Sequence, residues 1–110
     1  MSLYSSRLLG PETHAAVAQA TRDARFTAGG ASRAFELLAN LLEEVVPVEL
    51  DEGVAEHASE LAVAYALRGA DAVHLASFER LDVGAAMLVT SDSRLARAAG
   101  ARSHAVAIPG

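Results

Sequence analysis

Hydrophobic and polar positions follow two different periods along the first half of the chain. Residues 3–9 alternate loosely and predict a short strand, which Gly10-Pro11 ends. From Glu12 to about Arg25 apolar residues recur at helical spacing, and a turn is expected at 27–30. A second helical pattern covers about 32–44. We therefore expect one strand followed by two helices.

The second half of the chain alternates between β-branched runs and helical patterns. The predicted elements are a strand at 45–50 that Pro47 makes irregular or places at an edge, helices at 51–67 and 71–81, a buried parallel strand at 86–90, a helix over 92–99 closed by Gly100, and a strand at 105–108. Strands that alternate with helices predict an α/β fold, with a parallel sheet covered by helices on both faces. We expect residues 1–110 to form one domain.

Composition narrows the class of protein. About a quarter of the 110 residues are alanine, so the core should be thin and the helices closely packed. The net charge is −5 and every basic residue is an arginine, which leaves no basic stripe for general nucleic-acid binding. The chain has no cysteine, which excludes thiol catalysis and zinc-thiolate sites. With no signal peptide or membrane span visible, we expect a soluble cytoplasmic protein.

Three acidic residues stand where parallel α/β sheets place their sites, beyond strand ends and at helix starts. Glu12 follows the first predicted strand, Asp92 follows the strand that ends at Thr90, and Asp71 opens a helix. Each could simply cap its helix, as we expect of Asp51. If the three converge, their mutual repulsion calls for a cation, and all-oxygen ligands favour Mg²⁺ or Mn²⁺.

Two segments resemble a known family. The sequence LRGADAVHLA at 67–76 resembles a segment of PIN domains, and LVTSDSRLA at 88–96 resembles a second segment found about twenty residues later in that family. Residues 5–9, followed by Glu12, are similar to the family's second-strand region. The resemblance is strongest to the toxins of toxin–antitoxin pairs, the VapC type, and it implies a three-layer fold with a central parallel sheet.

The resemblance implies a metal-dependent endoribonuclease in which Mg²⁺ or Mn²⁺ activates the water that attacks an RNA phosphodiester. By position, Glu12, Asp71 and Asp92 match the family's metal-binding acids, and Thr90 matches a hydroxyl close to the metal. Arg94, with Arg97 beside it, could contact RNA phosphate or simply be solvated. An antitoxin protein and a second copy of the chain are the implied partners.

One part of the family pattern is missing. The family begins with a strand that carries its first acid, whereas no aspartate precedes Glu12. The resemblance thus implies an N-terminally truncated domain, inactive unless its acidic site is completed, and an oligomer that covers the apolar surface left by the strand. A second hypothesis is a non-catalytic module for protein binding or dimerisation, with Phe35, Leu38 and Leu42 either in the core or facing a partner helix. A third is an unrelated α/β domain whose acids are only caps.

Overall fold

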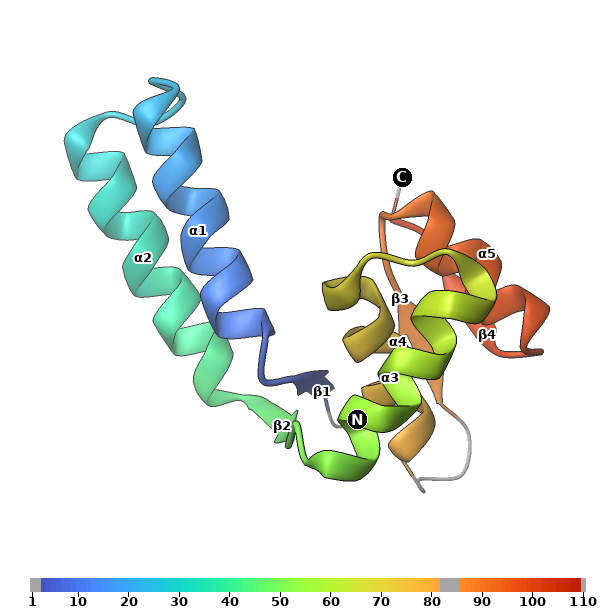
Figure 1. The fold of residues 1–110 in the computed structure, drawn as a ribbon. Coiled ribbons are helices and arrows are strands. Elements are labelled where there is room, and N and C mark those ends of the chain that lie inside the picture. The colour runs from blue at the N-terminus through green and yellow to red at the C-terminus, as the bar shows by residue number, and fades with distance from the viewer. Residues whose placement is uncertain (1–2, 82–85, 110) are drawn as a thin grey trace. The chain divides into compact units, whose positions relative to one another are not determined.

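The computed structural model describes residues 3–81 and 86–109 (Figure 1). The chain forms two compact units, Met1–Val48 and Glu49–Gly110, called here the N-terminal and C-terminal units. The positions of the two units relative to one another are not determined, so each is described by itself. Among the described residues, no helix is both long enough and apolar enough to cross a membrane.

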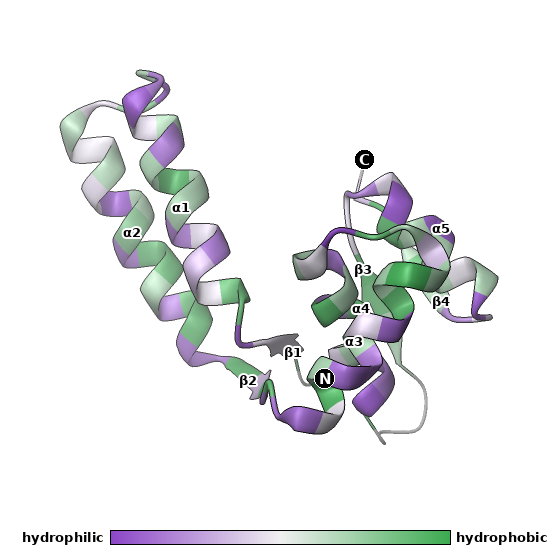
Figure 2. Cartoon of the chain, viewed as in Figure 1, coloured by the Kyte–Doolittle hydropathy of each residue, from purple (hydrophilic) through white to green (hydrophobic). Residues whose placement is uncertain are grey.

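The N-terminal unit is a helical hairpin joined to a small parallel sheet. Its elements in order are β1 (Leu3–Ser6), α1 (Leu9–Arg22), α2 (Ala28–Glu43) and β2 (Val45–Val48). The two strands pair in parallel, with Leu3 opposite Val45. Figure 1 shows α1 and α2 side by side along their length, and Figure 2 shows hydrophobic and hydrophilic residues interspersed along both. The predicted strand, helix, helix, strand order of this half is confirmed.

The boundaries of these helices differ from those expected. Gly29 and Gly30 were expected in a turn, but they lie in the first turn of α2. The Thr27 side chain caps that helix, because its hydroxyl accepts a hydrogen bond of 3.0 Å from the Gly30 amide. Pro11 lies in the first turn of α1, where the missing proline N–H costs no helical hydrogen bond.

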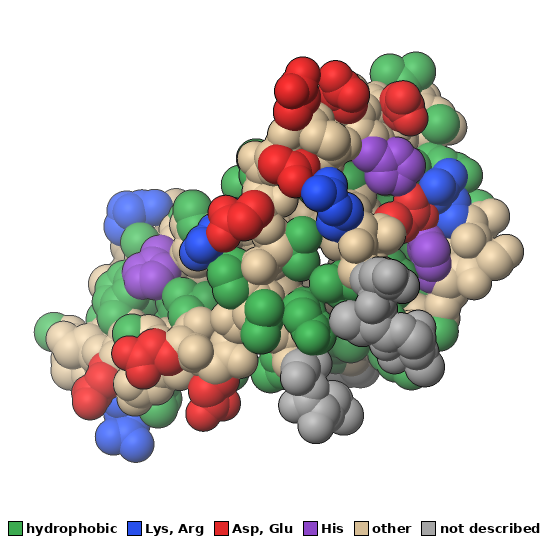
Figure 3. Space-filling model, turned by 90° about the horizontal axis from the view of Figure 1, so that it is seen from below, with side chains coloured by type: hydrophobic (Ala, Val, Ile, Leu, Met, Phe, Trp, Pro, Cys, Tyr) green, Lys and Arg blue, Asp and Glu red, His purple; other side chains and the backbone are tan. Residues whose placement is uncertain are grey.

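The hairpin of the N-terminal unit has little core of its own. Within the part of the chain that the structure describes, no residue of α1 is buried and Ala31 is the one buried residue of α2. Phe35 is half-buried and its ring stacks on that of His14 at a centroid distance of 5.8 Å. Leu37 and Leu41 are exposed, and Figure 3 shows hydrophobic side chains reaching the surface between charged ones. The hairpin therefore leaves large apolar side chains exposed within its own unit.

The C-terminal unit packs three helices against a second small sheet. Its elements are α3 (Glu52–Tyr65), α4 (Gly69–Arg80), β3 (Met87–Val89), α5 (Ser93–Ala101) and β4 (Ala105–Ala107). β3 pairs with β4 in parallel, which confirms the predicted parallel pairing. The α/β class is therefore correct. Among the described residues, however, the four strands form two sheets of two strands each and not one continuous sheet.

The core of the C-terminal unit lies among α3, α4 and α5. Its buried members are Val54, Ala58, Leu61, Leu67, Ala72, Leu75, Ala76, Leu95, Ala98 and Ala99. Half of these residues are alanines, so the helices approach closely and each contact buries little area. The thin, alanine-rich core expected from composition is present here.

Two expectations for the end of the chain are wrong. β3 was expected to be buried on both faces, yet Met87 is 57% exposed and Val89 is 62% exposed. A strand with one neighbouring strand and one covered face leaves alternate side chains in solvent. Gly100 was expected to close the last helix, but it lies inside α5, and Ser103 turns the chain with φ of 66°.

Candidate active site

Two of the three candidate acids come together at one arginine. Asp71 lies in the first turn of α4 and is 9% exposed, while Asp92 is the residue that caps α5. Arg68 donates from Nε to Asp71 Oδ2 at 3.2 Å and from Nη2 to Asp92 Oδ2 at 3.0 Å. The carboxylates of Asp71 and Asp92, called here the acid pair, therefore face the same cationic group.

The Asp92 carboxylate has two tasks. Its Oδ1 accepts hydrogen bonds from the amides of Leu95 at 3.0 Å and Arg94 at 2.9 Å, while its Oδ2 faces Arg68. The Leu95 amide, helped by the Arg94 amide and the charge of Arg68, holds the pKa of Asp92 below its ordinary value. The Thr90 hydroxyl accepts from the Asp92 amide at 3.1 Å and so fixes the turn between β3 and α5. The predicted cap is confirmed, and one carboxylate oxygen still points to the acid pair.

Glu12 belongs to the other unit. It lies in the first turn of α1, is exposed, and its amide donates to the Leu8 carbonyl at 3.0 Å. Because the two units are not placed relative to one another, its distance from the acid pair is not defined. Its assignment as a third ligand stays a prediction.

The acid pair has the chemistry of a partial divalent-cation site. Carboxylate and hydroxyl oxygens are the hard donors that Mg²⁺ and Mn²⁺ prefer, and Arg68 shows that a cation is favoured between Asp71 and Asp92. Among the described residues no group of three or more His, Cys, Asp or Glu side chains is arranged to hold a metal. The acid pair can thus supply two carboxylate ligands and needs further donors.

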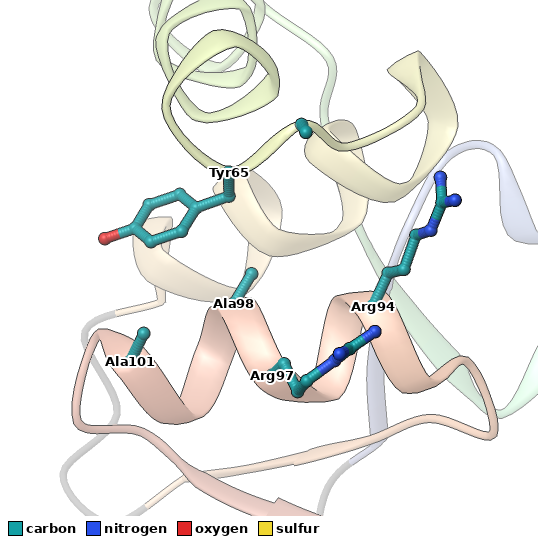
Figure 4. A pocket seen from close by; sticks show the side chains of 6 residues that line it. Tyr65, Arg94, Arg97, Ala98 and Ala101 are labelled. Carbon is teal, nitrogen blue, oxygen red and sulfur yellow. The ribbon is translucent and has the colours of Figure 1, made fainter.

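A hollow in the same unit is lined by residues that include close sequence neighbours of Arg68 and Asp92. It has a volume of about 510 Å³ and is lined by Tyr65, Ala66, Arg94, Arg97, Ala98 and Ala101. Figure 4 shows both arginines extending from α5 while the Tyr65 ring comes from the end of α3. Arg94 lies two residues after Asp92 in the sequence and its amide donates to Asp92 Oδ1, so one residue of the hollow is bonded to the acid pair.

A second polar cluster in the C-terminal unit surrounds Glu79. Its Oε1 accepts from His57 Nε2 at 2.6 Å and from Arg102 Nη2 at 2.8 Å, and its Oε2 accepts from Arg102 Nε and His104 Nε2. Burial raises the pKa of Glu79, but the hydrogen bonds from Arg102, His104 and His57 outweigh burial and bring it to about 2. Glu79 thus ties α3 and the turn after α5 to α4.

Sequence reasoning did not single out Arg68 or Tyr65. The spacing of Arg68 and Asp71, three residues apart at a helix start, was a usable signal because residues i and i+3 lie on one helix face. The part played by Tyr65 depends on the end of α3 lining the same hollow as α5, for which the sequence offers no local signal.

Comparisons with known proteins agree with the two acidic segments. Residues 12–101 match the family described as PIN domain. Ribonuclease VapC45 of Mycobacterium tuberculosis (strain CDC 1551 / Oshkosh) is 47% identical, and the match covers 89% of this chain and 70% of that protein. Ribonuclease VapC49 of Mycobacterium tuberculosis (strain ATCC 25618 / H37Rv) matches with the same identity and coverage. No solved structure matches the chain significantly.

Proposed function

The chain belongs to the PIN-domain family of VapC type, and on this premise we propose that it is the ribonuclease toxin of a toxin–antitoxin pair. The observation that carries the proposal is the convergence of Asp71 and Asp92 on Arg68. These carboxylates come from the two segments that first indicated the family. Two relatives that are 47% identical are named ribonucleases, which supports hydrolysis of RNA phosphodiesters by this chain.

We propose that Asp71 and Asp92 hold Mg²⁺ or Mn²⁺, with Glu12 as a further ligand. When bound, the metal supplies Lewis acidity for attack of water on the phosphodiester and for the charge that develops there. Asp92 is held in place by its two helix-capping hydrogen bonds, and Thr90 fixes the turn that carries it. We propose that Arg94, which lines the hollow and whose amide donates to Asp92 Oδ1, binds a phosphate of the substrate.

Completion of the fold is part of the proposal. Each sheet has two strands among the described residues, and an isolated two-stranded sheet is marginally stable. We propose that a further strand, carrying the acid with which the family's pattern begins, completes one of these sheets. The exposed leucines of α2, Leu37 and Leu41, support burial against a second copy or an antitoxin. A stable monomer in sedimentation velocity would contradict the oligomer.

Carboxylate-to-amide variants test the nuclease directly. Asp71→Asn and Asp92→Asn should each reduce Mn²⁺-dependent cleavage of single-stranded RNA by about 100-fold or more, since each removes an anionic ligand of the metal that would stabilise the negative charge of the transition state. Asp23→Asn, an exposed aspartate in the other unit, is the matched control and is purified in parallel to detect a contaminating nuclease. Equal residual cleavage in all three variants would refute the proposed site.

A non-catalytic binding module is the second candidate. The observation that favours it is Arg68, which already neutralises part of the charge of the acid pair. This candidate predicts no cleavage and no Mn²⁺ binding at millimolar concentration by isothermal titration calorimetry. Binding of Mn²⁺ that is lost in Asp71→Asn would exclude it.

A further inference from the structure

We propose that the hollow lined by Tyr65, Arg94 and Arg97 is a subsite for single-stranded RNA, in which the arginines bind backbone phosphate and the tyrosine stacks on a base. The inference rests on the proposed function and deepens it, because it names how the strand next to the cut phosphodiester is held. Its parts are an unpaired pair of cations, an aromatic ring and open space between them.

The distribution of charge among the arginines of the C-terminal unit is the first argument. The described part of the C-terminal unit holds five arginines, and three of them are paired with carboxylates: Arg68 with the acid pair, Arg80 with Asp51, and Arg102 with Glu79. Arg94 and Arg97 have no acidic partner among the residues the structure describes. Both unpaired arginines line the same hollow. In a protein with a net charge of −5, this concentration of free positive charge fits an anionic ligand.

The geometry of α5 carries the second step. Arg94 and Arg97 are three residues apart, so their side chains leave the same face of the helix about 5–6 Å apart at Cβ. Both are exposed, and Figure 4 shows them extending from adjacent turns. Two guanidinium groups at this spacing can contact one phosphate or two successive phosphates of a strand.

The position of the Tyr65 ring, which lines the hollow beside the arginines, is the third argument. Its ring is half-buried and is braced by Arg102, whose guanidinium carbon lies 5.8 Å from the ring centroid. The other residues of the hollow are alanines, which leave room for a flat ring beside the tyrosine. An aromatic ring next to free arginines is the usual combination for single-stranded nucleic acid, because every base has a face that can stack. Bases in a duplex are already stacked, so this subsite selects single strands.

The position of the hollow links it to the proposed cut. The Arg94 amide donates to Asp92 Oδ1, so the first arginine of the hollow adjoins the acid pair. A phosphodiester at the acid pair would place its neighbouring nucleotide over Arg94 and the next toward Arg97. The subsite thereby sets the direction in which the strand leaves the cleavage site.

Binding measured without metal tests the subsite separately from catalysis. A fluorescein-labelled single-stranded RNA, the same strand with abasic positions, and the corresponding duplex are titrated with full-length protein in EDTA by fluorescence anisotropy. Arg94→Gln and Arg97→Gln should each weaken single-strand binding and reduce the slope of log affinity against log salt by about 0.7. Arg33→Gln, an exposed arginine of α2 with the same charge change, should leave the affinity and the slope unchanged.

The abasic strand isolates the tyrosine. Tyr65→Ala should weaken binding of the intact strand by about tenfold and leave binding of the abasic strand nearly unchanged, whereas Tyr65→Phe should retain intact-strand affinity. Thermal unfolding followed by circular dichroism checks that Tyr65→Ala is folded. If Tyr65→Ala does not fold, the variants Arg94→Gln and Arg97→Gln still test the subsite. Affinity of both arginine variants equal to that of Arg33→Gln, or duplex binding as tight as single-strand binding, would overturn the proposal.

The outcome also separates the subsite from the nuclease. Loss of cleavage in Asp71→Asn with normal strand binding by the Tyr65 and arginine variants would leave the nuclease standing and refute the subsite. Reduced strand binding by those variants with no cleavage by the native protein would support the subsite and refute the nuclease. An acidic peptide that binds the hollow while single-stranded RNA does not would refute the subsite.

Discussion

Arg68 Nη2 lies 3.0 Å from Asp92 Oδ2, which joins the residues at the N-terminal ends of two different helices. Arg68 immediately precedes α4 and Asp92 immediately precedes α5, and the same guanidinium also reaches Asp71 in the first turn of α4. The starts of both helices are thus held together by a cation between two carboxylates. A divalent metal at the acid pair has to compete with this arginine.

Replacing the arginine should therefore strengthen metal binding. Arg68→Gln removes the competing charge, so we expect Mn²⁺ affinity to rise by about threefold to tenfold in isothermal titration calorimetry. Because Arg68 is 71% exposed at its side chain, stability without metal should change little. Arg33→Gln serves as the charge-matched control. Weaker Mn²⁺ binding in Arg68→Gln would show that the arginine organises the acid pair and does not compete for it.

Asp92 caps α5 and is also a proposed metal ligand, and replacing it by serine separates these two roles. Asp92→Ser keeps an oxygen that can accept from the amides of Arg94 and Leu95, so the helix cap and the free energy of unfolding should be nearly preserved. Asp92→Ala loses the cap and should cost about 1 kcal/mol in urea unfolding followed by far-ultraviolet circular dichroism. Both variants lack the carboxylate and should lose RNA cleavage equally. Cleavage by Asp92→Ser near the native level would remove Asp92 from the metal site.

The helices and their order were predictable because their signals are local. Helical spacing of apolar residues predicted the five helices described and their order, although the bounds of α1 and α2 differ. The capping roles of Asp51 and Asp92 followed from a short polar side chain before each helix. The prediction of a turn at Gly29 and Gly30 was wrong. Thr27 caps α2, so both glycines lie in the first turn of that helix.

Burial and sheet arrangement were not predictable in the same way. The apolar run that contains Met87 and Val89 has the composition of a buried strand, but its burial depends on neighbours that lie far away in the sequence. The acid pair shows the same limit. The sequence predicted that Asp71 and Asp92 lie at the starts of helices. It did not predict the hydrogen bond that joins Arg68 to Asp92, because these residues are 24 positions apart in the chain.

The cluster around Glu79 should make stability depend on pH in the acid range. Hydrogen bonds from Arg102, His104 and His57 outweigh burial and bring the pKa of Glu79 from 4.5 to about 2, so its ionised form is favoured in the folded protein. This contribution is fully present above pH 4.5 and is lost as the pH falls toward 2. Its upper limit is about 3 kcal/mol.

Glu79→Gln tests this contribution. The free energy of unfolding of the variant should be about 1–3 kcal/mol lower than that of the native protein at pH 7. This difference in free energy of unfolding should narrow as the pH falls below 4.5. Glu36→Gln, on an exposed position of α2, should follow the native pH profile. A gap that stays constant down to pH 2 would mean that Glu79 stabilises by packing and not by charge.

Ala66 has a backbone conformation that favours glycine. It ends α3 with φ of 52° and ψ of 44°, in the left-handed region, where a Cβ atom costs about 1 kcal/mol. Ala66→Gly should therefore raise the free energy of unfolding by about 0.5–1 kcal/mol. Ala55→Gly removes the same methyl group from an exposed position inside α3 and should lower it by a similar amount. Both variants remove one methyl group, so the backbone conformation of the substituted position is what distinguishes them. If urea unfolding shows that both are destabilised, the Ala66 side chain stabilises the turn before Arg68.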